Sequence, residues 1–441
     1  MRAIRILVST LLVLPLAIAS AAQESSTTIR DNGHMRWTYS DGENRFDVQS
    51  EGEIVFGDDD RSILRVSDGG YITIRLTEGN RRVELDVRPG RNGAPVYDYS
   101  VNGRERAFDA TAQREVGDLL LMVVRETGIN AETRVARILR DSGPDGVFAE
   151  IEEIRSGSSV ARYLTELVAQ TNLDASRLNR AADVAVRRVS SSGSRARFLR
   201  TSAAAYMAVE ETYEPYFGAV ASIESSGDRT RTLMAVLEAE PNREAFAYLL
   251  DVASDISSSG DKTRLLMASL GRFPSDTAIR EQYFRAVKTI PSSGDRSRLL
   301  QALLTEYEID AGTASMAFDA AAGISSSGDK ARVLTAAAPY YTDTDAEREA
   351  YFRAVSTISS SGDHARVLSA LLDGRELSKA TLLAVLHSIR GISSIGDAGR
   401  VLREAAPFVE DDDLVDAYLA AAESISSPGD RSRALAALIE Q

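Results

Sequence analysis

The sequence predicts an α+β, multidomain protein: a small antiparallel β-meander domain followed by an all-α solenoid of helical hairpins, each about 34 residues long. The solenoid is predicted by a phrase, ISSSGDKTRLL at residues 256–266, which returns with few changes at 324–334 and 358–368. Looser copies begin at residues 189, 223, 290, 392 and 425. The β domain is predicted by short β-branched runs that alternate with Asp-Gly or Glu-Gly turns.

The first 22 residues have the features of a secretory signal. Arg2 and Arg5 precede an apolar run over residues 6–18, and Ala19-Ser20-Ala21 offers small residues for cleavage. We therefore predict a signal peptide over 1–22 and a periplasmic or secreted location. A retained membrane anchor is the alternative, although the run is short for a bilayer and contains Pro15. After cleavage we expect no transmembrane segment.

Residues 23–33 are polar and are predicted to form a disordered linker, followed by a β-rich domain over 34–110. Strands are expected at 35–39, 45–49, 63–66, 71–76 and 82–87, because β-branched residues alternate with polar ones there. A last hairpin is expected from 96–101 and 104–108, joined at Asn102-Gly103. The predicted topology is a meander.

The α-solenoid domain is predicted over 111–441. Val116, Leu119, Leu120, Val123 and Val124 lie on one helical stripe, which begins the helical part of the chain. Each later unit is predicted to hold two helices, and the phrase joins the second helix of one unit to the first helix of the next. In the second helices an aromatic and aliphatic stripe recurs, as at Tyr351, Phe352, Val355 and Ile358, and is interpreted as core.

The phrase carries one aspartate and, three residues later, one arginine in nearly every unit. An isolated surface pair would contribute only ~0–1 kcal/mol, too little to explain this recurrence. We therefore hypothesise a buried or half-buried ladder in which each guanidinium bridges carboxylates of neighbouring units. In the alternative, each aspartate caps its helix and each arginine lies in solvent. The ladder residues would be Asp228, Asp261, Asp295, Asp329, Asp363, Asp397, Asp430, Arg231, Arg264, Arg298, Arg332, Arg366, Arg400 and Arg433.

The other positions of the phrase have simpler expected roles. The serines are expected to cap the first helix of each unit, and the glycine to allow a tight path or a positive φ. The second residue after the glycine is usually basic, and two interpretations are open. It either lies solvated at the helix start or lines a ridge that meets an acidic partner. The basic members of this column are Arg195, Arg229, Lys262, Arg296, Lys330, His364 and Arg431.

No residue set in the sequence identifies a reaction. Ser259 and Lys262 match a serine-x-x-lysine spacing, but other units replace the lysine and the companion motifs are missing. Asp58-Asp59-Asp60 and the run at 410–413 are acidic and lack the spacing of a calcium loop. We therefore predict no catalytic, cofactor-binding or metal-binding residue, and no cofactor. The net charge of −14 argues against a nucleic-acid partner.

The repeats resemble helical arrays in poorly characterised exported bacterial proteins, HEAT-like or tetratricopeptide-like in shape, some of which occur beside membrane sensor metallopeptidases. The resemblance covers residues 112–441, and the preceding meander is similar to the β-rich region often found upstream. The tryptophan-leucine-glycine-tyrosine signature of tetratricopeptide repeats is missing. No histidine-glutamate-x-x-histidine motif is present, so the resemblance implies no peptidase activity.

These observations predict a non-enzymatic, exported scaffold or binding protein that engages a protein or peptide along the solenoid surface. The alternative is a cell-envelope sensor or enzyme whose site lies in the β domain or at its junction with the solenoid. A purely structural spacer is a third interpretation. The sequence names neither the partner nor the oligomeric state.

Overall fold

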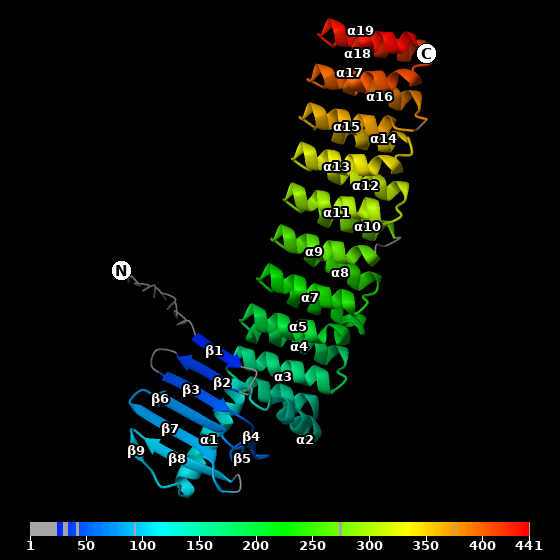
Figure 1. Ribbon diagram of the computed structural model, residues 1–441. Helices are drawn as coiled ribbons and strands as arrows, with labels where there is room; N and C mark the ends of the chain where they lie inside the picture. Colours follow the sequence, from blue (N-terminus) through cyan, green and yellow to red (C-terminus); the bar gives the residue numbers. More distant parts are fainter. Residues whose placement is uncertain are drawn as a thin grey trace, which may run out of the picture. The chain divides into compact units, whose positions relative to one another are not determined.

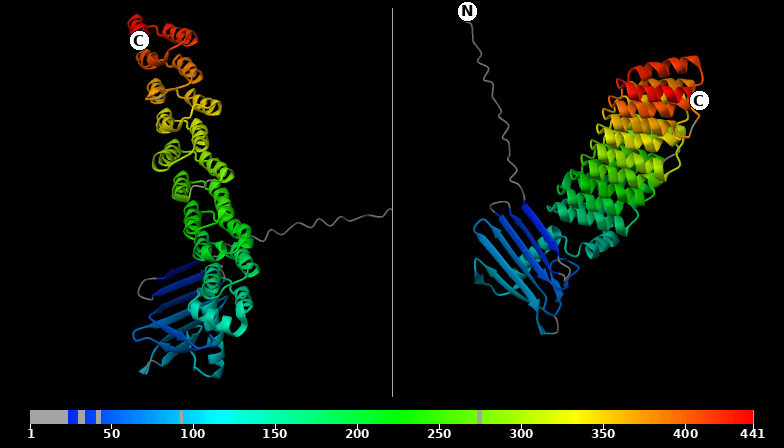
Figure 2. Two further views of the ribbon diagram at one scale, coloured as in Figure 1. Left: turned by 90° about the vertical axis from the view of Figure 1, so that its right-hand side faces the viewer. Right: turned by 45° about the horizontal axis from the view of Figure 1, so that its top comes forward.

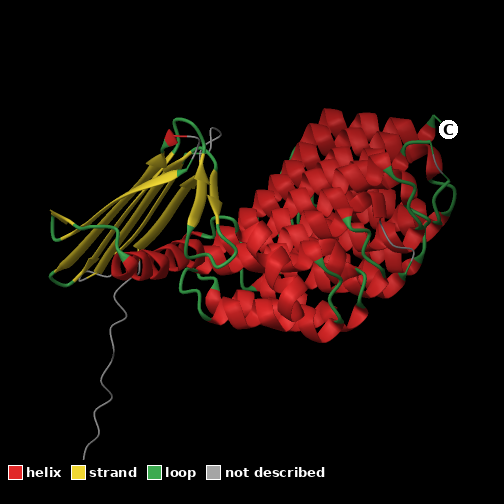
Figure 3. Ribbon diagram, turned by 90° about the horizontal axis from the view of Figure 1, so that it is seen from below, coloured by secondary structure: helices red, strands yellow, loops and turns green. Residues whose placement is uncertain are grey.

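A computed structural model describes residues 24–29, 34–40, 44–91, 94–272, 276–374 and 376–440 (Figure 1). The chain forms two compact units, Met1–Glu166 (unit 1) and Leu167–Gln441 (unit 2). The predicted signal peptide over 1–22 lies outside the described residues. Strands belong to unit 1 and the long helical array belongs to unit 2 (Figure 3), as the sequence predicts for an α+β protein with a solenoid.

Nine strands are described in unit 1. Seven of them form one antiparallel sheet in the order β1-β2-β3-β6-β7-β8-β9, and β4 and β5 pair separately. The bounds are β1 Glu24–Ile29, β2 Met35–Ser40, β3 Asn44–Glu51, β4 Ile54–Phe56, β5 Ile63–Val66, β6 Tyr71–Glu78, β7 Arg81–Pro89, β8 Pro95–Val101 and β9 Arg104–Glu105.

The sheet is the predicted meander with two corrections. Residues 24–29 belong to the segment predicted to be a disordered linker, yet they form strand β1, which pairs with β2 from Glu24–Ser40 to Ile29–Met35. The predicted strand at 63–66 does not join the meander. Because β3 and β6 pair along their full lengths, β5 is excluded from the sheet and pairs with the unpredicted strand β4.

The core of unit 1 lies between one face of the sheet and the first helix, α1 (Ala110–Thr127). Alternate residues of the strands point to this face, among them Trp37, Val48, Ile74 and Leu85. The stripe of α1 that the sequence predicts, including Leu120, packs against them. Since this helix completes the core of the sheet, it belongs to the first compact unit, although the sequence analysis places it in the solenoid domain that begins at residue 111.

Two further helices follow in unit 1, α2 (Ala131–Glu152) and most of α3 (Gly157–Gln170). The break predicted at Gly143-Pro144-Asp145 is a kink inside α2, where Gly143 has φ 65° and ψ −170°. Proline is tolerated there because the non-helical backbone at Gly143 has already interrupted the hydrogen-bond ladder.

The helices of unit 2 stack in regular order (Figure 1). Their bounds are α4 Ala175–Arg188, α5 Ser192–Met207, α6 Tyr213–Ala221, α7 Ser226–Glu238, α8 Arg243–Ser254, α9 Ser259–Ser269, α10 Thr277–Lys288, α11 Ser293–Glu306, α12 Ala311–Ala322, α13 Ser327–Ala337, α14 Asp345–Val355, α15 Ser361–Leu372, α16 Lys379–Ile389, α17 Ile395–Ala405, α18 Asp412–Glu423 and α19 Pro428–Ile439. Single 3₁₀ turns follow or precede some of them, at Glu210–Thr212, Leu270–Arg272, Ala338–Tyr340 and Ala406–Phe408.

The helices of unit 2 form two layers (Figure 2). The first helices of the units, α5 and then every odd-numbered helix to α19, pack each against the next odd-numbered helix. We call this set layer A. The even-numbered helices from α4 to α18 pack in the same way and form layer B. Each unit is therefore a hairpin whose two helices both contact the neighbouring unit, which is the stacking expected of a solenoid.

The aromatic stripe of layer B is core, as predicted. Tyr216, Tyr283, Tyr351 and Tyr418 are buried, and each hydroxyl donates a hydrogen bond to a backbone carbonyl of a layer A helix. The acceptor is Leu266 for Tyr283, at 3.0 Å. Because the hydroxyl is satisfied, the ring can fill the interface between the layers without leaving an unpaired polar atom.

Candidate binding surface

Every layer A helix from α5 to α19 begins with the predicted serine cap. In each case the serine side chain accepts a hydrogen bond from the backbone N–H three residues later, as Ser258 does from Asp261 at 3.3 Å. The phrase glycine lies in the first helical turn, and in none of these helices does it adopt a positive φ. Of the two roles expected for this glycine, a tight path or a positive φ, the positive φ does not occur.

The serines also join neighbouring units. The serine before the glycine in one unit contacts the first serine of the next phrase, as Ser293 contacts Ser325 at 2.8 Å and Ser361 contacts Ser393 at 2.8 Å. The run is interrupted where Pro291 occupies the place of the first serine, and the buried hydroxyl of Ser259 has no partner there. Sequence analysis assigned these serines to caps and missed the contacts between units.

In four units the basic residue two positions after the glycine is buried. Lys262 and Lys330 are only 3% exposed, and Arg296 and His364 are buried too. The Lys262 ammonium donates to the carbonyl of Ser254 at 2.8 Å in its own unit and to Thr289 Oγ1 at 2.6 Å in the next. We call these residues the inner basic column: Arg195, Arg229, Lys262, Arg296, Lys330, His364 and Arg431. Both sequence interpretations are therefore wrong for the four buried members, while Arg195, Arg229 and Arg431 are half-buried.

The partners of the inner basic column are helix C-termini of layer B. The Arg195 guanidinium donates to the carbonyls of Val189 and Ser222, which follow α4 and α6. A helix C-terminus carries partial negative charge and unpaired carbonyls, so it can hold a buried cation without a carboxylate. Burial lowers the pKa of the Lys262 and Lys330 ammonium groups and of the His364 imidazole.

The arginine two positions further along forms no ladder between units. Among the described residues, each arginine from Arg231 to Arg366 has its ion pair with the aspartate of its own helix, at 2.5 Å for Arg231–Asp228 and 2.8 Å for Arg366–Asp363. The five arginine side chains are 53–65% exposed and the five aspartates 14–21%. The bridging hypothesis is wrong, because a side chain three residues away on one helix is closer than the next helix.

The two last members of the predicted ladder behave similarly, with one difference. Arg433 pairs with Asp430 in α19. Arg400 lies 3.7 Å from Asp397 but also pairs with Glu404 at 3.2 Å, and Glu404 accepts a second hydrogen bond from Ser369. The guanidinium of Arg400 is therefore engaged within the protein on two sides.

Ion pairs between units do exist, in layer B. Arg243 in the first turn of α8 pairs with Asp276, the N-cap of α10, at 3.0 Å. Arg280 pairs with Asp310, the N-cap of α12, and this contact with the Thr313 bond lowers the pKa of Asp310 to about 2. Asp319 lies between Lys288 of one unit and Arg353 of the next. The charges of layer B thus connect units through ion pairs, which the arginines of the predicted ladder in layer A do not.

Small residues flank the arginines on the outer side of layer A. One turn before each arginine is the phrase glycine, and one turn after it is an alanine in five successive helices. A Cβ added to Gly260 or Gly294 would meet nothing within 4 Å, so these positions are open. We call this set the outer arginine column: Arg231, Arg264, Arg298, Arg332 and Arg366, with the alanines Ala235, Ala268, Ala302, Ala336 and Ala370.

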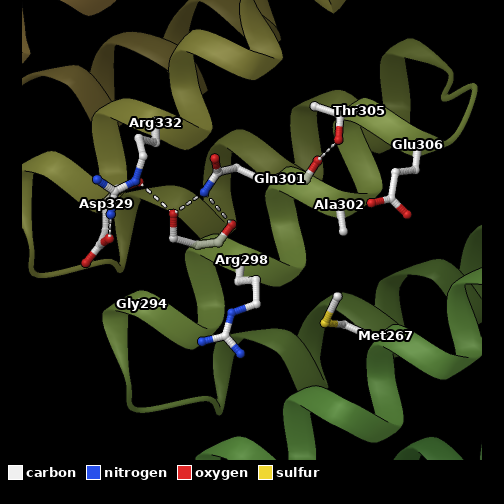
Figure 4. Close-up of a pocket in the computed structure, with 10 residues that line it drawn as sticks. Met267, Gly294, Arg298, Gln301, Ala302, Thr305, Glu306, Asp329 and Arg332 are labelled. Carbon is white, nitrogen blue, oxygen red and sulfur yellow. Dashed lines mark hydrogen bonds and ion pairs between the residues drawn. The ribbon is translucent and has the colours of Figure 1, made fainter.

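A groove of about 500 Å³ lies on this surface, where α9, α11 and α13 meet (Figure 4). Arg298 and Arg332 line it together with Met267, Ala302 and Glu306. Its floor is held by the side chain of Ser297, which donates to the carbonyl of Asp329 at 3.0 Å and accepts from Gln301 at 2.9 Å. The groove is open, and its charged groups do not converge on one point, which suits an extended ligand better than a small one.

Unit 1 contains a buried charged cluster. Arg134 donates to Asp60 at 2.6 Å, to Glu150 at 2.7 Å and to the hydroxyl of Tyr163 at 2.9 Å. Burial alone would lower the pKa of Arg134, but the contacts with Tyr163, Glu150 and Asp60 outweigh it and raise that pKa. The Asp58-Asp59-Asp60 run therefore supplies a buried ion-pair partner for α2.

The remaining candidates from the sequence are not assembled into a site. The Lys262 ammonium is bound to Ser254 and Thr289, and Ser259 has no hydrogen-bond partner, so the serine-x-x-lysine spacing forms no catalytic pair. In the acidic run at 410–413, Asp411 caps α18. In the described part of the chain, no three histidine, aspartate or glutamate side chains are grouped to hold a metal ion.

The comparisons with known proteins add little. No protein-family model matches the chain, and no curated protein is similar to it. One similar solved structure, described as "Computational Design of Self-Assembling Cyclic Protein Homooligomers", is 16% identical over 74% of this chain and 97% of its own, with a TM-score of 0.13. A likeness with this TM-score carries no argument. None of the helices in the described residues is both long and apolar enough to cross a bilayer.

Proposed function

We propose that this protein is a non-enzymatic, exported binding protein that engages a protein or peptide partner along the outer surface of layer A. One observation carries the proposal: five successive layer A helices carry the same glycine, arginine and alanine, and their arginines are exposed on that surface although none of these arginines joins one unit to another. An exposed ion pair on one helix contributes ~0.3–0.5 kcal/mol, so stability alone does not account for the repetition.

The periplasmic or secreted location belongs to the same proposal and rests on the signal sequence over 1–22. The alternative, an envelope sensor or enzyme with its site in the β domain or at its junction with the solenoid, is not favoured by any observation on the described residues. The buried charges of unit 1 are paired with one another, which is the arrangement of a structural cluster.

A photo-crosslinking amino acid placed in the full chain tests the proposal. We compare Ala268, which is exposed on α9 of layer A, with Ala278, which is exposed on α10 of layer B. The expected result is one defined cross-linked protein from the Ala268 position, whose purified form binds the full chain in a fixed ratio. Equal cross-linking from both positions, or a partner that fails to bind when purified, contradicts the proposal.

A further inference from the structure

The outer arginine column has hydrogen-bonding capacity that the fold leaves unused. Arg231, Arg264 and Arg332 each donate one hydrogen bond, through one terminal nitrogen, to the aspartate three residues before. A guanidinium has five N–H donors in a planar fork. The opposite edge of each guanidinium therefore faces solvent and can take a carboxylate in a two-point contact.

The aspartates orient these arginines without covering them. Their carboxylates are mostly shielded while the guanidinium groups are mostly exposed, so an approaching ligand meets the positive end of each pair first. A side chain already held by one ion pair also loses less conformational entropy when it binds a second anion.

The small residues beside each arginine allow a ligand backbone to come close. A glycine lies one turn before each of these arginines, in the first turn of its helix. At Gly260 and Gly294 no neighbouring atom and no positive φ requires it, because a Cβ there would lie in open space. At these two positions the open space is available to a group from outside the chain, whereas a Cβ at Gly227, Gly328 or Gly362 would contact an arginine or aspartate side chain at 3.5–4.0 Å.

Building on the proposed function, we infer that the outer arginine column binds an acidic peptide segment in the polyproline II conformation, with one carboxylate for each arginine. Packed helices lie about 8–10 Å apart, which sets the spacing of the arginines across layer A. A polyproline II helix has three residues per turn and rises about 3.1 Å per residue, so every third side chain returns to the same side after about 9 Å. The spacing of the arginines across layer A therefore matches the spacing of every third side chain in the peptide.

Other anionic ligands fit this surface less well. A β-strand places every third side chain on alternating faces, so only half of its carboxylates would reach the arginines. An acidic polysaccharide would gain from aromatic side chains on which sugar rings stack. The outer column and the residues between its members, Met234, Met267, Gln301, Thr335 and Ser369, include no aromatic residue.

The column ends at α17, because Glu404 occupies the place of the flanking alanine and its carboxylate is bound to Arg400. The Glu404 carboxylate thus already binds Arg400 in the way that a carboxylate of the ligand would bind the other arginines. Replacing Glu404 with alanine leaves the Arg400 guanidinium with Ser369, at 2.9 Å, and Asp397, at 3.7 Å, and no longer with a carboxylate one turn later. We expect the binding surface to lengthen by one unit.

Fluorescence anisotropy with the full chain and labelled peptides tests the inference. The probe is (Glu-Pro-Pro)₅, compared with (Gln-Pro-Pro)₅, which lacks the charge, and (Glu-Pro-Pro-Pro)₄, which changes the spacing. We expect both comparison peptides to bind at least tenfold more weakly. The R298Q/R332Q variant should bind the probe at least tenfold more weakly. The matched control R285Q/R390Q removes two exposed arginines of layer B and should change binding less than twofold. E404A should strengthen binding of (Glu-Pro-Pro)₆.

Three outcomes would overturn the inference: equal binding of the glutamine peptide, equal losses in the two double variants, or tighter binding of polygalacturonate at the same arginines. Circular dichroism of each variant shows that a loss of binding is not a loss of fold. If the acidic peptides fail to bind while the Ala268 cross-link persists, the ligand chemistry is wrong and the proposed function stands. If the cross-link is also absent, the proposed function fails as well.

Discussion

Two columns of basic residues run side by side through unit 2, and the structure treats them in opposite ways. Lys262 and Arg264 are two residues apart on α9, yet Lys262 is 3% exposed and the side chain of Arg264 is 64% exposed. Lys262, like Arg195 and Arg229, binds carbonyls at the ends of two successive layer B helices. The outer arginine column binds only the aspartate of its own helix and otherwise faces solvent.

The difference teaches that a cation can hold two repeats together without any carboxylate. A buried ammonium is costly unless every proton is hydrogen-bonded, and the unpaired carbonyls at the end of a helix supply the acceptors. In several units a buried or half-buried cation joins two layer B helices in this way, whereas Ala398 takes its place in α17, and the second basic residue of the phrase is left free for another role. The predictions that follow test this division, from the largest expected effect to the smallest.

Removing a buried cation that has carboxylate partners should have the largest effect. Arg134→Met leaves Asp60 and Glu150 buried without their shared partner, although Arg125 and Arg137 remain nearby. We expect a loss of about 3–5 kcal/mol in the free energy of unfolding. Urea denaturation followed by circular dichroism measures it. Arg140→Met, an exposed arginine of the same helix, is the control, and similar losses in both variants would contradict the expectation.

The comparison between the columns is tested most directly on α9. Lys262→Met removes the ammonium from three acceptors, and we expect a loss of about 2–4 kcal/mol because buried carbonyls lose their donor. Arg264→Met removes an exposed ion pair, and the expected change is ~0–1 kcal/mol. Thermal unfolding of the two variants gives the answer. Equal shifts would show that the outer arginines also stabilise the array.

The serine contacts between units offer a smaller test with a built-in control. The Ser327 hydroxyl contacts Ser359 Oγ at 3.1 Å and the backbone N–H groups of Ser359 and Ser360, whereas the buried Ser259 hydroxyl has no partner. We expect Ser327→Ala to cost about 1 kcal/mol and Ser259→Ala to be neutral or slightly stabilising. Chemical denaturation distinguishes them, and a larger cost at Ser259 would refute the assignment.

His364 should make the array sensitive to pH at one joint. It occupies the inner basic column and contacts Ser388 Oγ at 2.8 Å, and burial lowers its pKa below the usual value of about 6.5. The unfolded chain then takes up the proton more readily than the folded chain, so stability falls as the pH drops below that value. Melting temperatures between pH 7.5 and 5 should fall more for the natural protein than for His364→Lys. Parallel curves would contradict this.

Much of the architecture follows from the sequence alone. The repeat of 33 or 34 residues sets the hairpin stacking, and the positions of Tyr283 and Tyr351 on a helical stripe identify the core side of layer B. The serine caps are equally local, since the hydroxyl bonds a backbone group three residues away. The extent of the first compact unit was not predictable in this way, because α1 belongs to the sheet by packing and not by its sequence pattern.

By itself, the sequence determined the period, the caps, the core stripes and which columns are charged, because each of these depends on contacts within one hairpin. Only the tertiary structure decided that Lys262 is buried and Arg264 exposed, that the ion pairs between units lie in layer B, and that β1 extends the sheet. These outcomes depend on where a neighbouring helix or strand ends. Lys262 and Arg264 are only two residues apart, so their different exposure depends on the helices packed around them and not on the local sequence.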